Sequence, residues 1–89
     1  MQLQLVARIT DPDLLSKSIH EHGTLFYQQD TKGNITRIVY FSSSRVIEYN
    51  GKVDENLATR VRAEGHQADT VEVDEFQSSV RIIQKSPSD

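Results

Sequence analysis

The stretch from Leu25 to Tyr49, LFYQQDTKGNITRIVYFSSSRVIEY, decides the fold of this chain of 89 residues. It is rich in β-branched and aromatic residues, which favour strands. Turn-forming residues interrupt it twice, at Asp30–Asn34 and at Ser42–Ser44. We therefore predict a meander of three antiparallel strands.

The last two strands of this meander have a register that suits their side chains. A tight loop at Ser42 and Ser43 would give two apolar cross-strand pairs and one pair of opposite charge: Ile38 with Ile47, Val39 with Val46, and Arg37 with Glu48. Matched pairs of this kind contribute roughly 0.2–1 kcal/mol each. A slip of one residue would place Ile38 against Glu48 and lose the match.

Helix signals flank the meander on both sides. Before it, Asp11 suits a helix cap, Pro12 suits the first helical position and Gly23 suits the end. After it, Asp54 and Gly65 are typical of a second helix start and stop. Each pair of signals encloses apolar residues at helical spacing, so we predict one helix on either side.

Alternating strand patterns occupy the remaining segments, at residues 2–9, 70–76 and 80–84, the last two forming a hairpin over residues 77–79. The predicted order is β-α-β-β-β-α-β(-β). We expect a single α+β domain over residues 1–85, with two helices packed on a mainly antiparallel sheet, and a flexible tail at 86–89. A ferredoxin-like arrangement is one version of this order, which alone does not decide the topology.

The composition excludes several classes of protein. The absence of cysteine excludes a disulfide scaffold and thiolate chemistry. The 13 acidic and 10 basic residues give a net charge of -3, and the cations form no cluster for gripping duplex DNA. The longest apolar run, Ile38–Phe41, is too short to span a membrane. With no secretory signal at the N-terminus, we expect a soluble, cytoplasmic protein.

Residues that could do chemistry form no catalytic pattern. His20 and His22 would lie on different sides of a helix, which is poor geometry for one metal ion. The serine run at Ser42–Ser44 suits a turn better than a nucleophile. We expect no enzyme, no metal and no cofactor. A small hydrolase or transferase using His22, His66 and nearby acids is a further alternative.

Aromatic residues concentrate in the meander, which holds five of the six in the chain. Alternation assigns Phe26, Ile38, Tyr40 and Ile47 to one face. It assigns Leu25, Tyr27, Val39, Phe41 and Val46 to the other. Both faces are apolar, whereas two short helices cover only one. The second face would meet the terminal strands, a second copy or a partner.

This excess of apolar surface predicts a binding role. We expect a non-catalytic protein–protein interaction module, a regulator, accessory factor or inhibitor that covers a partner surface and self-associates as a homodimer. The candidate contact residues are Tyr27, Arg37, Phe41, Arg45 and Tyr49. The alternative is a single-stranded RNA or nucleotide-binding module, in which bases stack on the sheet aromatics beside the arginines.

Overall fold

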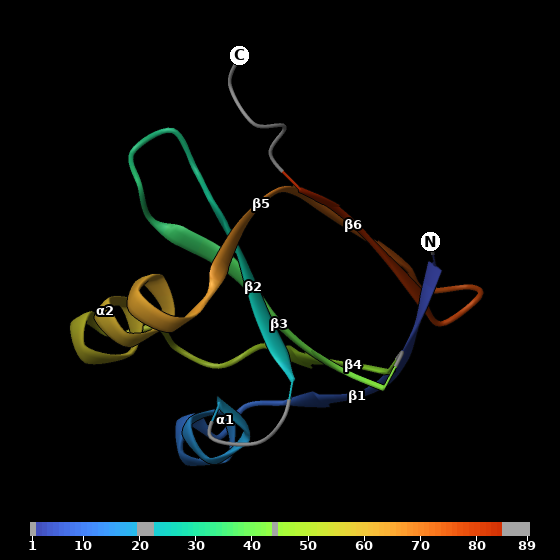
Figure 1. Cartoon of the computed structure of the whole chain (residues 1–89), viewed down its shortest axis with the longest axis horizontal. Helices are drawn as coiled ribbons and strands as arrows, with labels where there is room; N and C mark the ends of the chain where they lie inside the picture. The colour runs from blue at the N-terminus through green and yellow to red at the C-terminus, as the bar shows by residue number, and fades with distance from the viewer. Residues whose placement is uncertain (1, 20–22, 44, 85–89) are drawn as a thin grey trace.

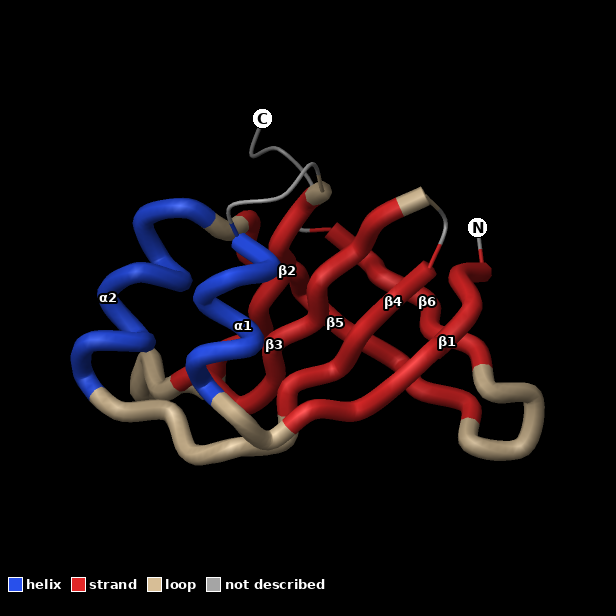
Figure 2. The backbone as a smooth tube through the Cα atoms, turned by 90° about the horizontal axis from the view of Figure 1, so that it is seen from below, coloured by secondary structure: helices blue, strands red, loops and turns tan. Residues whose placement is uncertain are grey.

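In the computed structural model the described residues, 2–19, 23–43 and 45–84, form six strands and two helices (Figures 1 and 2). The strands close into a barrel in the order β1-β4-β3-β2-β5-β6. The helices lie together on one side of it (Figure 2). The tail predicted at 86–89 lies outside the described residues. The bounds are β1 Gln2–Ile9, α1 Pro12–Ile19, β2 Thr24–Gln29, β3 Ile35–Ser42, β4 Arg45–Tyr49, α2 Glu55–Glu64, β5 His66–Asp74 and β6 Ser79–Gln84.

The predicted element order is confirmed, but the predicted fold class is wrong. The chain is a mostly β barrel, and it is neither a ferredoxin-like fold nor an α+β fold with helices on an open sheet. The physical reason is two parallel pairings, β1 with β4 and β2 with β5. Strand β6 then pairs with both β5 and β1 and closes the ring. These contacts join strands far apart in the chain, so local sequence patterns do not reveal them.

The described elements form two βαββ units in succession: β1-α1-β2-β3 and β4-α2-β5-β6. If β1 is exchanged with β4, β2 with β5 and β3 with β6, every pair of neighbouring strands in the barrel is again a pair of neighbours. The hairpin β2–β3 then replaces the hairpin β5–β6, and the pair β3–β4 replaces the pair β6–β1. The parallel pairs β1–β4 and β2–β5 are unchanged. The connections of the barrel therefore have an approximate two-fold arrangement.

Local capping signals predict both helix starts correctly. The carboxylate of Asp11 accepts a hydrogen bond from the backbone N–H of Asp13 at 2.9 Å. The carboxylate of Asp54 accepts one from the N–H of Leu57 at 2.8 Å. Each bond satisfies a donor that has no partner within the helix. Helix α2 also ends at Gly65, as expected.

Two apolar clusters of the described residues occupy the two faces of the meander. One fills the barrel interior with Leu3, Phe26, Val39, Val46, Ala68, Val71 and Val80. The other packs the helices against the outer face of β2, β3 and β4. It contains Leu15, Leu25, Tyr27, Ile38, Tyr40, Tyr49, Leu57 and Val61. Of the three expected ways of covering the second face, the structure shows the first, because the terminal strands β1, β5 and β6 cover it within the same chain.

The register between β3 and β4 differs from the predicted one by two residues. Ser42 pairs with Arg45, so that Val39 lies opposite Glu48 instead of Val46. The turn falls one residue later than expected, and Ser43 adopts a positive φ of 50°. A shift of two residues leaves every side chain on the same face of the sheet. Arg37 and Glu48 consequently still meet, now diagonally, at 3.1 Å.

The faces assigned to β2 are wrong. Phe26 pairs with Val39, and Tyr27 pairs with Ile38. Directly paired residues share a face, so Phe26 lies in the barrel interior and Tyr27 lies under the helices. A register irregularity between Gln28 and Gln29 precedes the turn at residues 30–34, and a simple alternation count does not anticipate it.

Candidate functional site

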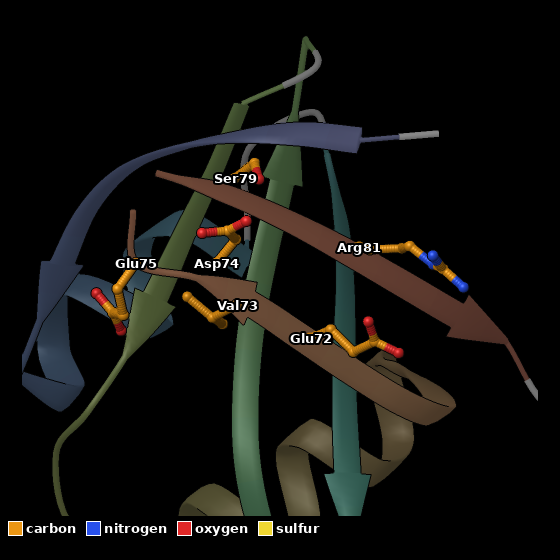
Figure 3. Close-up of a pocket in the computed structure, with 6 residues that line it drawn as sticks. All are labelled: Glu72, Val73, Asp74, Glu75, Ser79 and Arg81. Atoms are coloured by element: carbon orange, nitrogen blue, oxygen red, sulfur yellow. The ribbon is translucent and has the colours of Figure 1, made fainter. Parts of the chain in front are cut away.

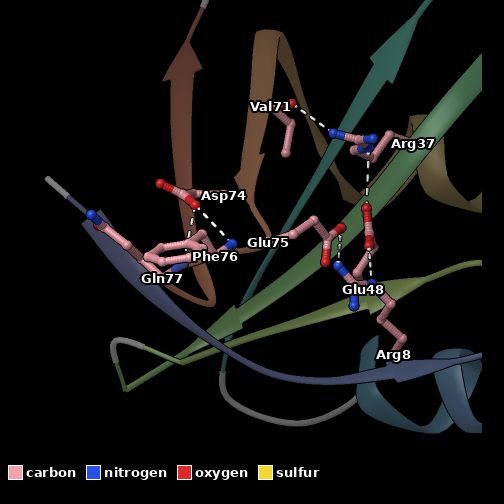
Figure 4. Close-up of polar contacts among 8 residues, drawn as sticks. All are labelled: Arg8, Arg37, Glu48, Val71, Asp74, Glu75, Phe76 and Gln77. Carbon is pink, nitrogen blue, oxygen red and sulfur yellow. Dashed lines mark hydrogen bonds and ion pairs between the residues drawn. The ribbon is translucent and has the colours of Figure 1, made fainter.

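Four charged residues of the described chain meet at the end of the barrel where β1 and β4 finish (Figure 4). We call Arg8, Arg37, Glu48 and Glu75 the mouth cluster. Glu48 is 4% exposed. Its Oε1 accepts from Arg8 Nε at 2.9 Å, and its Oε2 lies 3.1 Å from Arg37 Nε. Both oxygens of the buried carboxylate are therefore paired, as burial of a charge requires.

Arg8 reaches this cluster because β1 is irregular between Leu5 and Ala7. Leu3 and Leu5 pack in the barrel interior, and regular alternation would place Arg8 on the outside. One extra residue reverses the alternation. Arg8 then lies beside Glu48 in the parallel register. The hydrogen bonds to Glu48 and then to Glu75 raise the pKa of Arg8 above its ordinary value.

Arg37 also helps to close the barrel wall. β5 pairs with β2 at its first two residues. Further along, side chains make the connection: Arg37 Nη1 donates to the carbonyl oxygen of Val71 at 2.8 Å. The N–H of Val71 donates to Gln28 Oε1 at 3.4 Å. The wall between β5 and its neighbours is thus held partly by side chains near the mouth cluster.

The turn between β5 and β6, residues 74–78, carries the most exposed large apolar side chain of the described residues. We call it the Phe76 turn, because Phe76 is 98% exposed. Asp74 Oδ1 accepts from the N–H of Phe76 at 2.9 Å and from that of Gln77 at 3.1 Å (Figure 4). Ser78 adopts a positive φ of 51°. The aspartate side chain therefore closes the turn locally.

The Phe76 turn is also tied to β1. Glu75 accepts a hydrogen bond from Arg8 Nη2. The carbonyl oxygen of Ser78 accepts from the N–H of Leu5 at 2.9 Å and from Gln4 Nε2 at 3.1 Å. These bonds hold the backbone on either side of Phe76. The phenyl ring itself remains in solvent on a fixed backbone.

The turn between β2 and β3, residues 30–34, has the corresponding place in the other βαββ unit. Asp30 Oδ1 accepts from the N–H of Lys32 and of Asn34, both at 2.9 Å. Two residues after the capping aspartate this turn has Lys32, where the Phe76 turn has Phe76. This turn is therefore also closed by an aspartate, and it has no aromatic residue.

A hollow of ≈400 Å³ lies beside the Phe76 turn (Figure 3). It lies along the hairpin of β5 and β6, and three of its residues are acidic. The lining residues are Glu72, Val73, Asp74, Glu75, Ser79 and Arg81.

The residues predicted as partner contacts lie on different sides of the molecule. Tyr27 and Tyr49 are buried in the cluster under the helices. Tyr49 donates its hydroxyl to the carbonyl of Lys52 at 2.6 Å, and burial raises the pKa of Tyr49. Phe41 is half-buried against the barrel interior, and Arg37 belongs to the mouth cluster. Arg45 is exposed at the start of β4. Their contact with a partner stays a prediction.

The histidines give no candidate centre among the described residues. His20 and His22 lie outside those residues. His66 is exposed, with its ring centroid 5.8 Å from that of Phe26. In the described ranges no three acidic or histidine side chains are grouped so that they could hold a metal ion. Neither helix in these ranges has the length and apolar character needed to cross a membrane.

Sequence reasoning missed Arg8 and Phe76 as site residues. Arg8 read as an outward-facing polar residue of an alternating strand, and the irregularity in β1 has no sequence signal. Phe76 did have one: it is the aromatic residue outside the meander, and it follows Asp74 as Lys32 follows Asp30. No family model, curated protein or solved structure matches this chain. Function is therefore argued from the site itself.

Proposed function

We propose that this chain is a non-catalytic protein-binding module, acting as a regulator, accessory factor or inhibitor, and that the Phe76 turn contacts its partner. The observation that carries the proposal is the 98% exposure of Phe76 on a hydrogen-bonded turn. A phenyl ring in water has a large apolar surface to bury. A backbone that is already ordered loses less conformational entropy on binding.

The partner contact that we propose lies on the Phe76 turn, whereas the sequence-based prediction placed it on the meander. The sequence-based argument for docking, and for a homodimer, rested on a bare sheet face, and that face is the barrel interior. The Phe76 turn supplies independent support for docking. We also propose a cytoplasmic location, which cell fractionation with an antibody against the chain tests.

The mouth cluster supports the non-catalytic part of the proposal. Glu48 is the buried acid of the core, and an acid of this kind is a candidate general base. Arg8 and Arg37 occupy its two oxygens. This pairing leaves neither oxygen open to a substrate. We therefore assign this cluster a structural role.

The sheet tyrosines on which the RNA-binding alternative rests are buried. Stacking of bases needs exposed aromatic faces. Tyr27, Tyr40 and Tyr49 are 7%, 3% and 4% exposed, respectively. The protein-binding function is therefore the one that we propose.

Affinity capture from the native host tests this proposal. The immobilised full chain is compared with Phe76→Ser and with Lys32→Ser, which alters the corresponding position of the other turn. We expect at least one protein, measured by quantitative mass spectrometry, that the wild type and Lys32→Ser retain and Phe76→Ser loses. If every captured protein is retained equally by all three chains, the proposal is wrong.

A further inference from the structure

We propose that the partner surface for Phe76 is an apolar pocket bordered by Lys or Arg side chains, on a different protein and not on a second copy of this chain. This inference rests on the proposed function and specifies the class of partner. It follows from the excess of acidic residues on the hairpin that carries Phe76.

The hairpin that carries Phe76 is strongly acidic. Residues 66–84 contain four acids and one base, a net charge of -3, which equals that of the whole chain. The acids are Asp69, Glu72, Asp74 and Glu75, and the base is Arg81. Charges within about 8 Å of a contact act on it at physiological salt. Asp74 and Glu75 directly precede Phe76, so a surface that covers Phe76 meets these two acids.

The acids next to Phe76 are held in place. Asp74 points its carboxylate at the turn's own N–H groups, and Glu75 is bonded to Arg8. Glu72 is exposed and lies opposite Arg81 in the hairpin register. The hollow of ≈400 Å³ is lined by these three acids together with Val73, Ser79 and Arg81 (Figure 3). It has room for a basic side chain from the rim of the partner pocket.

A second copy of the chain is a poor occupant of this surface. In a two-fold dimer each hairpin would face its equivalent, because such interfaces use the same patch twice. Two hairpins that each carry -3 would then approach one another. Juxtaposed like charges oppose association, whereas a basic rim accelerates it. The charge pattern therefore favours a different protein over a homodimer through the turn.

Photo-crosslinking in the native host identifies the occupant. The full chain carries a photoreactive phenylalanine analogue at position 76, and the adduct is identified by mass spectrometry. An adduct with a different protein is followed by measurement of its affinity for the wild-type chain at low and moderate salt. The variants are Phe76→Ser, Glu72→Gln and, as a matched acid control on α2, Glu64→Gln. Circular dichroism checks that each variant is folded.

We expect binding to weaken about 30-fold in Phe76→Ser, as for an aromatic residue central to an interface. Glu72→Gln should weaken binding about three-fold and flatten its salt dependence, whereas Glu64→Gln should match the wild type.

An adduct with a second copy of the chain would overturn the inference. If binding depends on Phe76 but its affinity changes neither with salt nor in Glu72→Gln, the inference would also be overturned, and the proposed function would stand. An affinity of Phe76→Ser equal to that of the wild type would overturn both the inference and the proposed function.

Discussion

The two hairpin turns of the described residues, residues 30–34 and the Phe76 turn, are each closed by an aspartate and differ at their tips. In each, an aspartate closes the turn and an arginine from the other βαββ unit holds it. Arg62 of α2 donates to the carbonyl of Gly33 at 2.8 Å, and Arg8 of β1 donates to Glu75. The tip of one turn is Lys32 and the tip of the other is Phe76. The barrel therefore does not require an aromatic residue there, which places the reason for Phe76 outside the fold.

The two arginines that hold the turns differ in their other contacts. Arg62 is exposed, whereas Arg8 is also bonded to the buried Glu48. We expect Glu48→Gln to lower the free energy of unfolding by about 2 kcal/mol, because two charge-assisted hydrogen bonds to a buried group are weakened. Urea denaturation measures the loss. The control is Glu64→Gln in the exposed pair with Arg60, with an expected change of less than about 0.5 kcal/mol. Equal effects would show that the buried cluster adds nothing.

Backbone strain is the second difference between the turns. Gly33 has φ 88° and Ser78 has φ 51°. We expect Gly33→Ala to destabilise the protein by about 1 kcal/mol through strain, since an added Cβ would lie 3.7 Å from the nearest atom and would not clash. Ser78→Gly should stabilise by about 0.5 kcal/mol, because relief of strain exceeds the entropy cost of glycine. Guanidinium denaturation of both variants measures the two changes, and shifts of the same sign would contradict this account.

Acid should weaken the turn at residues 30–34 through Asp30. Hydrogen bonds from the N–H groups of Asn34 and Lys32 lower the pKa of Asp30. A lowered pKa means that the ionised form stabilises the fold above the unfolded value of about 3.9. That contribution is lost as the pH falls through the lower pKa that Asp30 has in the folded protein. Asp30→Asn should therefore lose less stability than the wild type between neutral pH and about pH 2, measured by denaturation at each pH. Parallel pH profiles would contradict the assignment.

The smallest expected effect is that of changing the tips. Phe76→Ser and Lys32→Ser should each alter the free energy of unfolding by less than about 0.5 kcal/mol, because both side chains project into solvent. Thermal denaturation followed by circular dichroism checks this. A loss of more than about 1 kcal/mol in Phe76→Ser alone would mean that the ring packs against the protein. That outcome would remove the basis of the binding proposal.

Features that depend on neighbouring residues were predictable from the sequence. The caps at Asp11 and Asp54 are local, because a side chain bonds to an N–H two or three residues later. The order of the strands and helices follows from such signals and from residue type. The ion pair of Arg37 with Glu48 was also predictable, because it tolerates a register shift of two residues.

The barrel and the site were not predictable from the same patterns. Closure depends on parallel pairs between distant strands, which have no turn to mark them. A single irregular residue in β1 moves Arg8 from the outside to the mouth cluster. The apolar second face of the meander was recognised, but the choice between terminal strands and a partner needed the strand order. The sequence pattern placed Phe76 in an alternating strand, whereas in the structure Asp74 closes a turn that contains Phe76.

Because the connections have an approximate two-fold arrangement, a circular permutant can keep the order of the elements. Strands β6 and β1 are neighbours, so a short linker can join them. A circular permutant that begins at Arg45 and is joined in this way would again read β-α-β-β-β-α-β-β. Native topology in this protein is thus compatible with two different starting points. Cooperative unfolding of the permutant would show that either unit can come first in synthesis.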